Sequence, residues 1–198
     1  MPDKKAEILI AARDLFNRQG YPKTSVDDIA QAVGMQKSSL YYYFKNKEEL
    51  FLQAFKDQWV EILRGFQKQA NKQPTPDQRI LACLNASLDH YDDTVLKHKI
   101  PIKVIIETRN QFRENMNEIN EERVRFYASC IEEGIASGIF KSCEIERLAK
   151  TIINLAFSFQ YDQFSIFVNQ TPSRQDLLKI KEDILYAVGL ILDGIKVK

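Results

Sequence analysis

The sequence contains few of the residues that build disulfide frameworks, zinc sites or membrane spans. Its 198 residues include three cysteines, Cys83, Cys130 and Cys143, and no CxxC spacing. An odd number of widely separated cysteines argues against disulfides and zinc, so we expect reduced thiols and no metal site. The longest apolar run, Tyr186–Leu192, is far shorter than the roughly 20 residues of a membrane-spanning helix. Because Arg13 interrupts the first apolar run, a secretory signal is not expected either, and we predict a cytoplasmic protein without a membrane partner.

Catalytic motifs are also missing from the sequence. His90 and His98 are its two histidines, and it has no HExxH motif, no glycine-rich phosphate loop and no GxSxG turn. Metal-dependent, phosphoryl-transfer and nucleophilic enzymes depend on such patterns. We therefore expect no catalytic residues and no cofactor, and a helical enzyme is the weaker alternative.

Charge is almost balanced over the whole chain but not along it. The formal net charge is +1, and residues 1–47 contain eight Lys or Arg against five Asp or Glu. The remaining residues are therefore slightly acidic in total. An anionic partner would be expected to contact the first quarter of the chain.

Helical periodicity dominates the sequence. Apolar residues recur with a period of about 3.6 in nearly every long segment, and no period-two strand pattern is present, so we predict an all-α fold. Three short helices are expected within residues 1–47, and the first covers residues 4–19. A long helix over residues 47–70 connects them to a larger helical domain, residues 48–198. The expected helices of that domain cover residues 76–97, 101–108, 110–137, 144–169 and 173–195.

The second and third expected helices have the pattern of a helix-turn-helix. Ser25 and Asp28 have the spacing of a capping box that opens a short helix, and Gly34 is placed to end it. In a DNA-binding helix-turn-helix the helix after the turn enters the major groove. The same geometry is also common in helical proteins that bind no DNA.

The helix after this turn, expected over residues 37–44, contains four consecutive aromatic residues. At about 100° per residue, Leu40 and Phe44 share one face, which would pack on the preceding helices. Ser38 and Tyr42 point the opposite way. Hydroxyl, amide and lysine side chains on that outward face suit base edges and phosphate oxygens.

A longer series of residues extends this pattern over residues 8–52. It consists of Ile8, Ala12, Phe16, Gly20-Tyr21, Thr24-Ser25-Val26, Ile29-Ala30, Val33-Gly34, Lys37, Leu40-Tyr41-Tyr42-Tyr43-Phe44 and Lys47-Glu48-Glu49-Leu50. This series resembles the N-terminal DNA-binding domain of TetR-family transcriptional regulators. The resemblance implies an all-helical homodimer that binds double-stranded DNA at a palindromic operator as a repressor. It also implies that a small molecule entering the C-terminal domain releases the DNA.

The same resemblance implies a set of residues that contact DNA. By position these are Thr24, Ser25, Gln36, Lys37, Ser38, Ser39, Tyr42, Tyr43 and Lys47. Gln36, Ser38 and Ser39 stand where the family often has Ser, Gly and Thr, and Tyr42 replaces a frequent His. Since these are outward positions, the resemblance does not imply an operator sequence.

The last two expected helices are apolar on more than one face. A single chain can cover one face of each helix, and the same two helices of a second protomer would most simply cover the other. We therefore expect a homodimer interface formed by Ile152, Phe159, Ile184, Val188 and Ile191. The alternative is that these helices lie at the centre of their own bundle.

Polar and aromatic side chains set into apolar helices indicate a pocket for a small-molecule effector. The candidates are Tyr91, Glu107, Arg109, Phe112, Tyr127, Phe157, Gln160, Tyr161 and Phe164. Their aromatic content suggests an apolar or aromatic effector of unknown identity. Each of them has an alternative role in core packing or on the solvated surface.

Two alternatives to this account stay open at the level of sequence. Oxidation of Cys130 or Cys143 could replace ligand binding as the trigger, although an isolated cysteine in a helical core is more often a small apolar residue. The protein could also be a helical small-molecule-binding or scaffold protein without DNA affinity. The presence of Lys37, Tyr42 and Lys47 argues against that second alternative.

Overall fold

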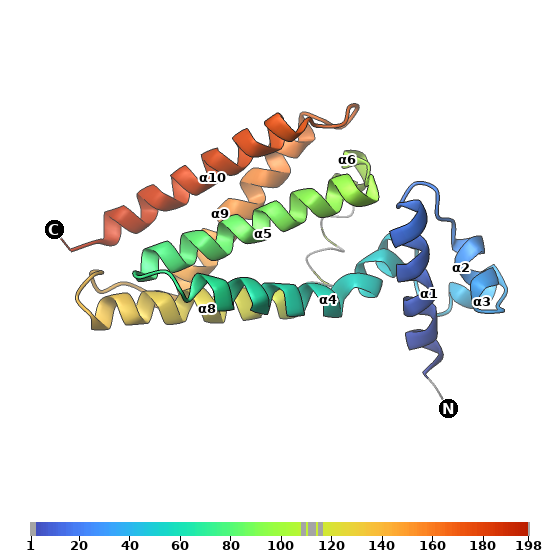
Figure 1. Ribbon diagram of the computed structural model, residues 1–198, viewed down its shortest axis with the longest axis horizontal. Helices are drawn as coiled ribbons and strands as arrows, with labels where there is room; N and C mark the ends of the chain where they lie inside the picture. The colour runs from blue at the N-terminus through green and yellow to red at the C-terminus, as the bar shows by residue number, and fades with distance from the viewer. Residues whose placement is uncertain (1–2, 108–109, 111–113, 115–116, 198) are drawn as a thin grey trace.

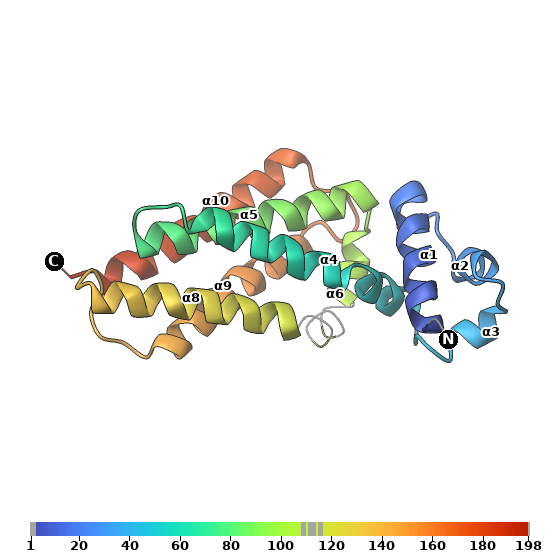
Figure 2. The ribbon, with the colours of Figure 1, turned by 60° about the horizontal axis from the view of Figure 1, so that its bottom comes forward.

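The chain folds into a small N-terminal group of helices and a larger helical bundle, joined by one long helix. The fold is given by a computed structural model, which describes residues 3–107, 110, 114 and 117–197. Figures 1 and 2 show the first three helices gathered at one end of an elongated molecule, with the helices of the bundle running away from them. Over the described residues the secondary structure is helical apart from one isolated bridge between Phe140 and Lys196. The prediction of an all-α fold is confirmed.

The N-terminal group consists of α1 (Lys4–Gln19), α2 (Val26–Ala32) and α3 (Lys37–Leu40). The expected capping box opens α2, with the Ser25 hydroxyl accepting from the Asp28 amide at 3.1 Å. Leu40 and Phe44 are both buried, as their shared helix face predicts. These contacts hold the three helices around one small apolar core.

The third helix is shorter than predicted. It ends at Leu40 and not at Phe44, because the following amides of Tyr42 and Tyr43 bond to the carbonyls three residues before them, at 3.3 and 3.0 Å. Such three-residue hydrogen bonds tighten the last turn of a helix. The side chains of this turn keep nearly the same directions. The four aromatic residues therefore still divide into an inner and an outer set.

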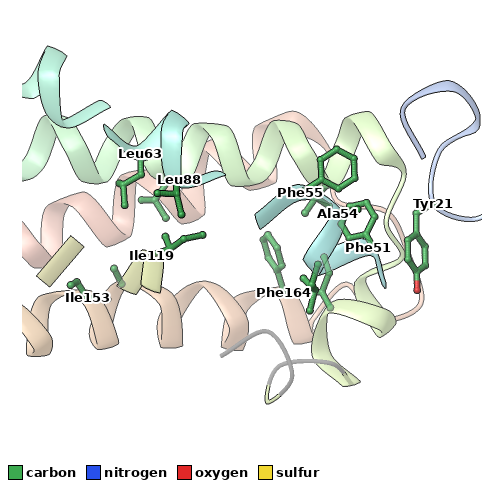
Figure 3. Close-up of a cluster of buried hydrophobic side chains, with 14 of the residues drawn as sticks. Tyr21, Phe51, Ala54, Phe55, Leu63, Leu88, Ile119, Ile153 and Phe164 are labelled. Carbon is green, nitrogen blue, oxygen red and sulfur yellow. The ribbon is translucent and has the colours of Figure 1, made fainter. Parts of the chain in front are cut away.

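The long helix α4 (Lys47–Ala70) connects the two parts of the molecule. Asn46 caps it by accepting from the Glu49 amide at 2.8 Å. Phe51 on this helix packs against Phe16 and Tyr21 of the N-terminal group, with ring centroids 5.0 and 5.5 Å apart. Figure 3 shows Tyr21, Phe51 and Phe55 at one end of the apolar cluster that continues into the bundle. A shift of α4 would therefore also move the N-terminal helices that pack on it.

The bundle is built around α5 (Pro76–His98), which packs against α4, α8 (Asn117–Ala136) and α10 (Arg174–Ile195). Helix α9 (Ile145–Ser165) packs against α8, α10 and the short α6 (Ile102–Glu107). Most bounds agree with the predicted ranges to within two residues. The prediction that α9 continues to residue 169 is wrong, since the chain leaves the helix in a turn after Ser165. No helix in residues 3–107 or 117–197 is long and apolar enough to cross a membrane.

Candidate DNA-binding surface and ligand cavity

The turn between α2 and α3 is fixed by backbone hydrogen bonds. Gly34 has a φ of 65°, a conformation that glycine adopts without steric cost. Its amide donates to the Gln31 carbonyl at 3.1 Å, and the Met35 amide donates to the Ala30 carbonyl at 2.8 Å. This pair of bonds is a Schellman motif, which ends α2 and sends the chain into α3 at a defined angle.

Most residues predicted to contact DNA lie together on the outer side of α3 and of the turn after it. Gln36, Lys37, Ser38 and Ser39 are exposed, and Tyr42 is 88% exposed. The half-buried ring of Tyr43 lies edge-on to the ring of Tyr42, with centroids 5.5 Å apart. We call these six residues the recognition surface. Gln36 precedes the helix without making a side-chain cap hydrogen bond, so its amide is available to a ligand.

Two of the lysines predicted to contact DNA, Lys37 in the recognition surface and Lys47 at the start of α4, have different partners. The Lys37 ammonium lies 2.7 Å from the carboxylate of Asp27, and this hydrogen bond and charge raise the pKa of Lys37. Both side chains are exposed, so the pair contributes little to stability and phosphate can compete with it. Lys47 instead lies over the ring of Tyr21, 4.2 Å from its centroid. Burial lowers the pKa of Lys47, while the charges of Glu48 and Asp28 oppose that shift.

The prediction that Thr24 contacts DNA with its side chain is wrong for this structure. Thr24 is 1% exposed, and its hydroxyl donates to the Gly20 carbonyl at 2.9 Å. That hydrogen bond ties the loop after α1 to the start of α2, which leaves no hydroxyl for DNA. Ser25, the next residue, is exposed at the N-terminus of α2 and keeps its place among the candidates.

A cavity of about 130 Å³ lies in the bundle between α4, α5, α6, α8 and α9. Its apolar wall includes Phe51, Leu52, Trp59, Ile62, Leu63, Phe66, Val95, Ile100, Val104, Ile105, Ile119 and Phe157. Polar groups are fewer and come from Tyr21, Glu48, Ser87, His90, Tyr91, Thr94, Asn120, Arg123 and Tyr161. An apolar cavity with few polar groups is the usual form of a small-molecule site.

Some of the predicted effector residues line this cavity and others do not. Tyr91, Phe157 and Tyr161 are part of its wall. Tyr127, Gln160 and Phe164 are buried and do not belong to the wall, and Gln160 donates to the Asp92 carboxylate at 3.1 Å. The effector role of these three residues stays a prediction, which the cavity wall itself does not support.

Three further predicted effector residues lie outside the cavity wall or outside the described residues. Glu107 is exposed at the end of α6 and lies 3.8 Å from the Lys103 ammonium, so its assignment to the pocket is wrong. Arg109 and Phe112 fall outside the residues that the structure describes. Their roles stay predictions.

Arg123 is a polar residue of the cavity that the sequence prediction missed. It is 9% exposed, and its guanidinium carbon lies 4.6 Å from the centroid of the Phe157 ring. A signal for it exists in the sequence, since Arg123 interrupts the buried series Ile119, Tyr127 and Ile131 at a spacing of four residues. Arginine is rarely buried unless it is paired, so an arginine within an apolar helix stripe is informative.

The predicted dimer interface also needs correction. Ile152, Ile184 and Val188 are at most 1% exposed within a single chain, so they have no surface left for a partner. Other helices of the same bundle cover these three residues, which agrees with the alternative that α9 and α10 lie at the centre of their own bundle. Phe159 and Ile191 are half-buried. The apolar side chains that α10 does expose are Leu178, Tyr186 and Leu190, at 42%, 69% and 55%.

An exposed helix after the turn, joined to a bundle with a mostly apolar cavity, is the arrangement expected of a DNA-binding regulator that responds to a ligand. Residues 8–54 match the family model of bacterial regulatory proteins, tetR family. The uncharacterised HTH-type transcriptional regulator YhgD of Bacillus subtilis (strain 168) is 27% identical over 164 residues, which are 81% of this chain and 84% of YhgD.

Two solved structures share the fold of this chain. A transcriptional regulator from Cytophaga hutchinsonii ATCC 33406 has a TM-score of 0.71 at 23% identity, covering 98% of this chain and all of the other. FadR from Bacillus subtilis in complex with stearoyl-CoA has a TM-score of 0.58 at 20% identity, covering 92% and 96%.

The family match at residues 8–54, together with relatives that span most of the chain, supports a TetR-family transcriptional regulator. Homologues in this family are ligand-responsive transcriptional repressors. TetR-family regulators bind DNA and small-molecule ligands, typically as dimers, and are generally not enzymes. No cluster of three or more His, Cys, Asp or Glu side chains that could hold a metal ion occurs within the described part of the chain.

Proposed function

We propose that the protein is a homodimeric repressor that binds a palindromic operator and is released from it by a small molecule in the bundle cavity. The observation that carries this proposal is the recognition surface, where polar and aromatic side chains are exposed directly above the buried Leu40 and Phe44. Two such surfaces, one per protomer, would enter successive major grooves about 34–36 Å apart. In this proposal residues 1–47 recognise DNA, and residues 48–198 bind the ligand and the partner.

The side chains of the recognition surface suggest which residues contact base edges and which contact phosphates. Gln36, Ser38 and Ser39 carry the amide and hydroxyl groups that read base edges. Tyr42 can pack on a thymine methyl or bond to phosphate, and Lys37 and Lys47 are placed to meet phosphates. We drop Thr24 from this set and keep Ser25, whose helix N-terminus favours a phosphate oxygen.

The dimer interface that we propose uses the outer side of α10. Leu178, Tyr186 and Leu190 expose apolar surface there, and Leu185 is half-buried beside them. Covering this surface with the same helix of a second protomer gives a symmetric interface. Phe159 and Ile191 stay in the proposed interface because part of each side chain is accessible.

The cavity offers a physical route from ligand to DNA. Its wall includes Tyr21, which belongs to the N-terminal group, and Glu48 on α4, whose carboxylate accepts a hydrogen bond from the Tyr21 hydroxyl. The Tyr21 amide also donates to the His98 carbonyl at the end of α5, at 2.7 Å. A ligand that spreads α4 from α5 would therefore move the N-terminal helices and change the separation of the two recognition surfaces. The stearoyl-CoA bound to FadR supports a ligand of apolar character.

A titration of the purified protein with fluorescent duplex DNA of random sequence tests the proposal without knowledge of the operator. At low salt the protein should bind any duplex through phosphate contacts. Lys37→Ala should weaken binding to all sequences and lower the salt slope by about one unit. Lys179→Ala, an exposed lysine on α10, is the matched control and should change neither quantity. A folded wild-type protein that binds no duplex at low salt would favour the alternative of a binding protein without DNA affinity.

A further inference from the structure

Arg123 places a positive charge in the wall of an apolar cavity. Its Nε is buried and makes no hydrogen bond, and its Nη1 donates to the side-chain oxygen of Asn120 at 3.1 Å. The carboxylate of the neighbouring Glu122 is paired with other residues, 2.7 Å from Arg125 and 3.7 Å from Arg64. No carboxylate of the described residues forms an ion pair with Arg123.

A buried guanidinium without a counter-charge is energetically costly. Removing a cation from water costs several kcal/mol unless an anion and hydrogen bonds replace the water. Burial lowers the pKa of Arg123, and the side chains of Tyr127 and Cys83 oppose that shift. Both of these side chains are uncharged when protonated, so neither is a counter-charge. An anionic group inside the cavity would supply the missing partner.

The positions of the lining residues indicate where the two ends of a ligand would lie in the cavity. The residues of α4 that line the cavity are spread from Glu48 to Phe66, a stretch of helix about 27 Å long at 1.5 Å per residue. Arg123 belongs to the Phe66 end, because the side-chain Nε2 of Gln67 donates to the backbone carbonyl of Glu122 at 3.4 Å. The other end carries the carboxylate of Glu48, which would repel an anion.

We propose that the effector is an elongated amphiphile whose single anionic head group pairs with Arg123 and whose apolar tail extends toward Phe51 and Tyr21. This inference rests on the proposed function, since it takes the cavity as the effector site. A guanidinium binds carboxylate and phosphate oxygens in the same two-bond geometry. The head group is therefore assigned by its charge, and the experiment distinguishes the two chemistries.

The single tryptophan of the chain, Trp59, lines the cavity and reports binding by its fluorescence. The probes are dodecanoate, dodecyl phosphate and the neutral dodecanol, which share one tail. Wild-type protein freed of copurifying ligand should bind one of the anions about tenfold or more tightly than dodecanol. The tighter anion identifies the head group.

Variants of Arg123 separate its charge from its packing. Arg123→Met removes the charge and keeps an apolar stem, so it should lose the preference for the anion while retaining affinity for dodecanol. Arg123→Lys keeps a charge and should keep part of the preference, and it serves as the test if Arg123→Met does not fold. Arg64→Met, an exposed arginine on α4, is the matched control and should bind as the wild type does.

Equal affinity of the wild type for dodecanol and both anions, or an anion preference that survives in Arg123→Met, would overturn the inference. Failure to bind any of the three probes would also overturn it. Binding of each ligand-free variant to random duplex DNA is measured on the same preparations. If the ligand-free wild type does not bind DNA, the proposed function is contradicted. The probe titration tests only the assignment of the head group.

Discussion

At the scale of single residues, the four aromatics Tyr41–Phe44 divide between packing and recognition. Phe44 is 1% exposed, whereas Tyr42 is 88% exposed. Sequence periodicity predicted this division, because Leu40 and Phe44 are four residues apart on one helix face. What the periodicity could not give is the end of α3, which depends on a change from four-residue to three-residue hydrogen bonds.

Replacing Tyr42 should separate DNA affinity from stability. We expect Tyr42→Ala to weaken DNA binding several-fold, while the free energy of unfolding changes by no more than about 0.5 kcal/mol, as is usual for exposed residues. Phe44→Ala should instead lose about 3–5 kcal/mol, because it empties a buried site. Urea unfolding and duplex titration of both variants measure the two quantities. Unchanged DNA affinity of Tyr42→Ala would remove it from the recognition surface.

The buried carboxyl of Asp92 should make stability depend on pH. Burial and the charge of Asp89 raise the pKa of Asp92 from 3.8 to about 7. Between these values the folded protein binds a proton that the unfolded chain has lost, so stability falls as pH rises toward 7. Asp92→Asn removes this dependence and should therefore gain about 1–3 kcal/mol more over the wild type at pH 8 than at pH 5.

Urea unfolding of wild type and Asp92→Asn at the two pH values gives this difference directly. Other titrating groups, including His90 and His98, contribute equally to both proteins and cancel. Asp183→Asn, at an exposed position of α10, should show no such change. A gain that is the same at pH 5 and pH 8 would mean that Asp92 does not titrate as described.

Two of the three cysteines, Cys83 and Cys130, are poorly suited to an oxidation trigger because they are buried. Burial raises the pKa of Cys83 to about 12 and of Cys130 to about 11, so both are protonated thiols near pH 7. Cys143 is half-buried and more accessible. We expect a thiol reagent to modify one cysteine rapidly in the native protein and the other two on unfolding. Rapid native modification of Cys130 would return the oxidation switch to consideration.

At the scale of elements, helix termini were predicted well where side chains cap them. Asn46 and Ser173 cap the N-termini of α4 and α10, as their spacing to Glu49 and Asp176 indicates. Each cap side chain accepts a hydrogen bond from the backbone amide three residues later. The faces of α9 and α10 were predicted less well. A sequence shows that Ile184 and Val188 are apolar, but it does not show whether the same chain or a partner covers them. Arg123 was missed for a related reason, since its site is formed by residues from other helices.

The corrected dimer interface leads to a prediction for α10. Tyr186→Lys combined with Leu190→Lys should convert the dimer to a monomer, because two charges would lie on the apolar surface that the partner covers. Ile10→Lys is the control, since Ile10 on α1 is 53% exposed and Leu190 is 55% exposed. Light scattering at micromolar concentration measures the mass. A dimer that persists in the double variant would place the interface elsewhere.

At the scale of the whole molecule, α4 links DNA recognition to the ligand cavity. Phe51 touches Phe16 and Tyr21 on one side, and its ring lies 5.6 Å from that of His98 at the end of α5. The cavity wall uses the same helix from Glu48 to Phe66. A ligand that favours one position of α4 therefore shifts the balance between DNA-binding and released forms by its difference in affinity for the two.

The measurement that tests this account most directly is selection of bound duplexes from a random DNA library by the purified dimer. The account predicts enrichment of a palindrome whose two half-sites are one helical turn apart, bound with a steep dependence on salt. The Tyr42→Ala variant should fail to enrich the same sequence. No enrichment at low salt, by a folded dimer freed of copurifying ligand, would contradict the account.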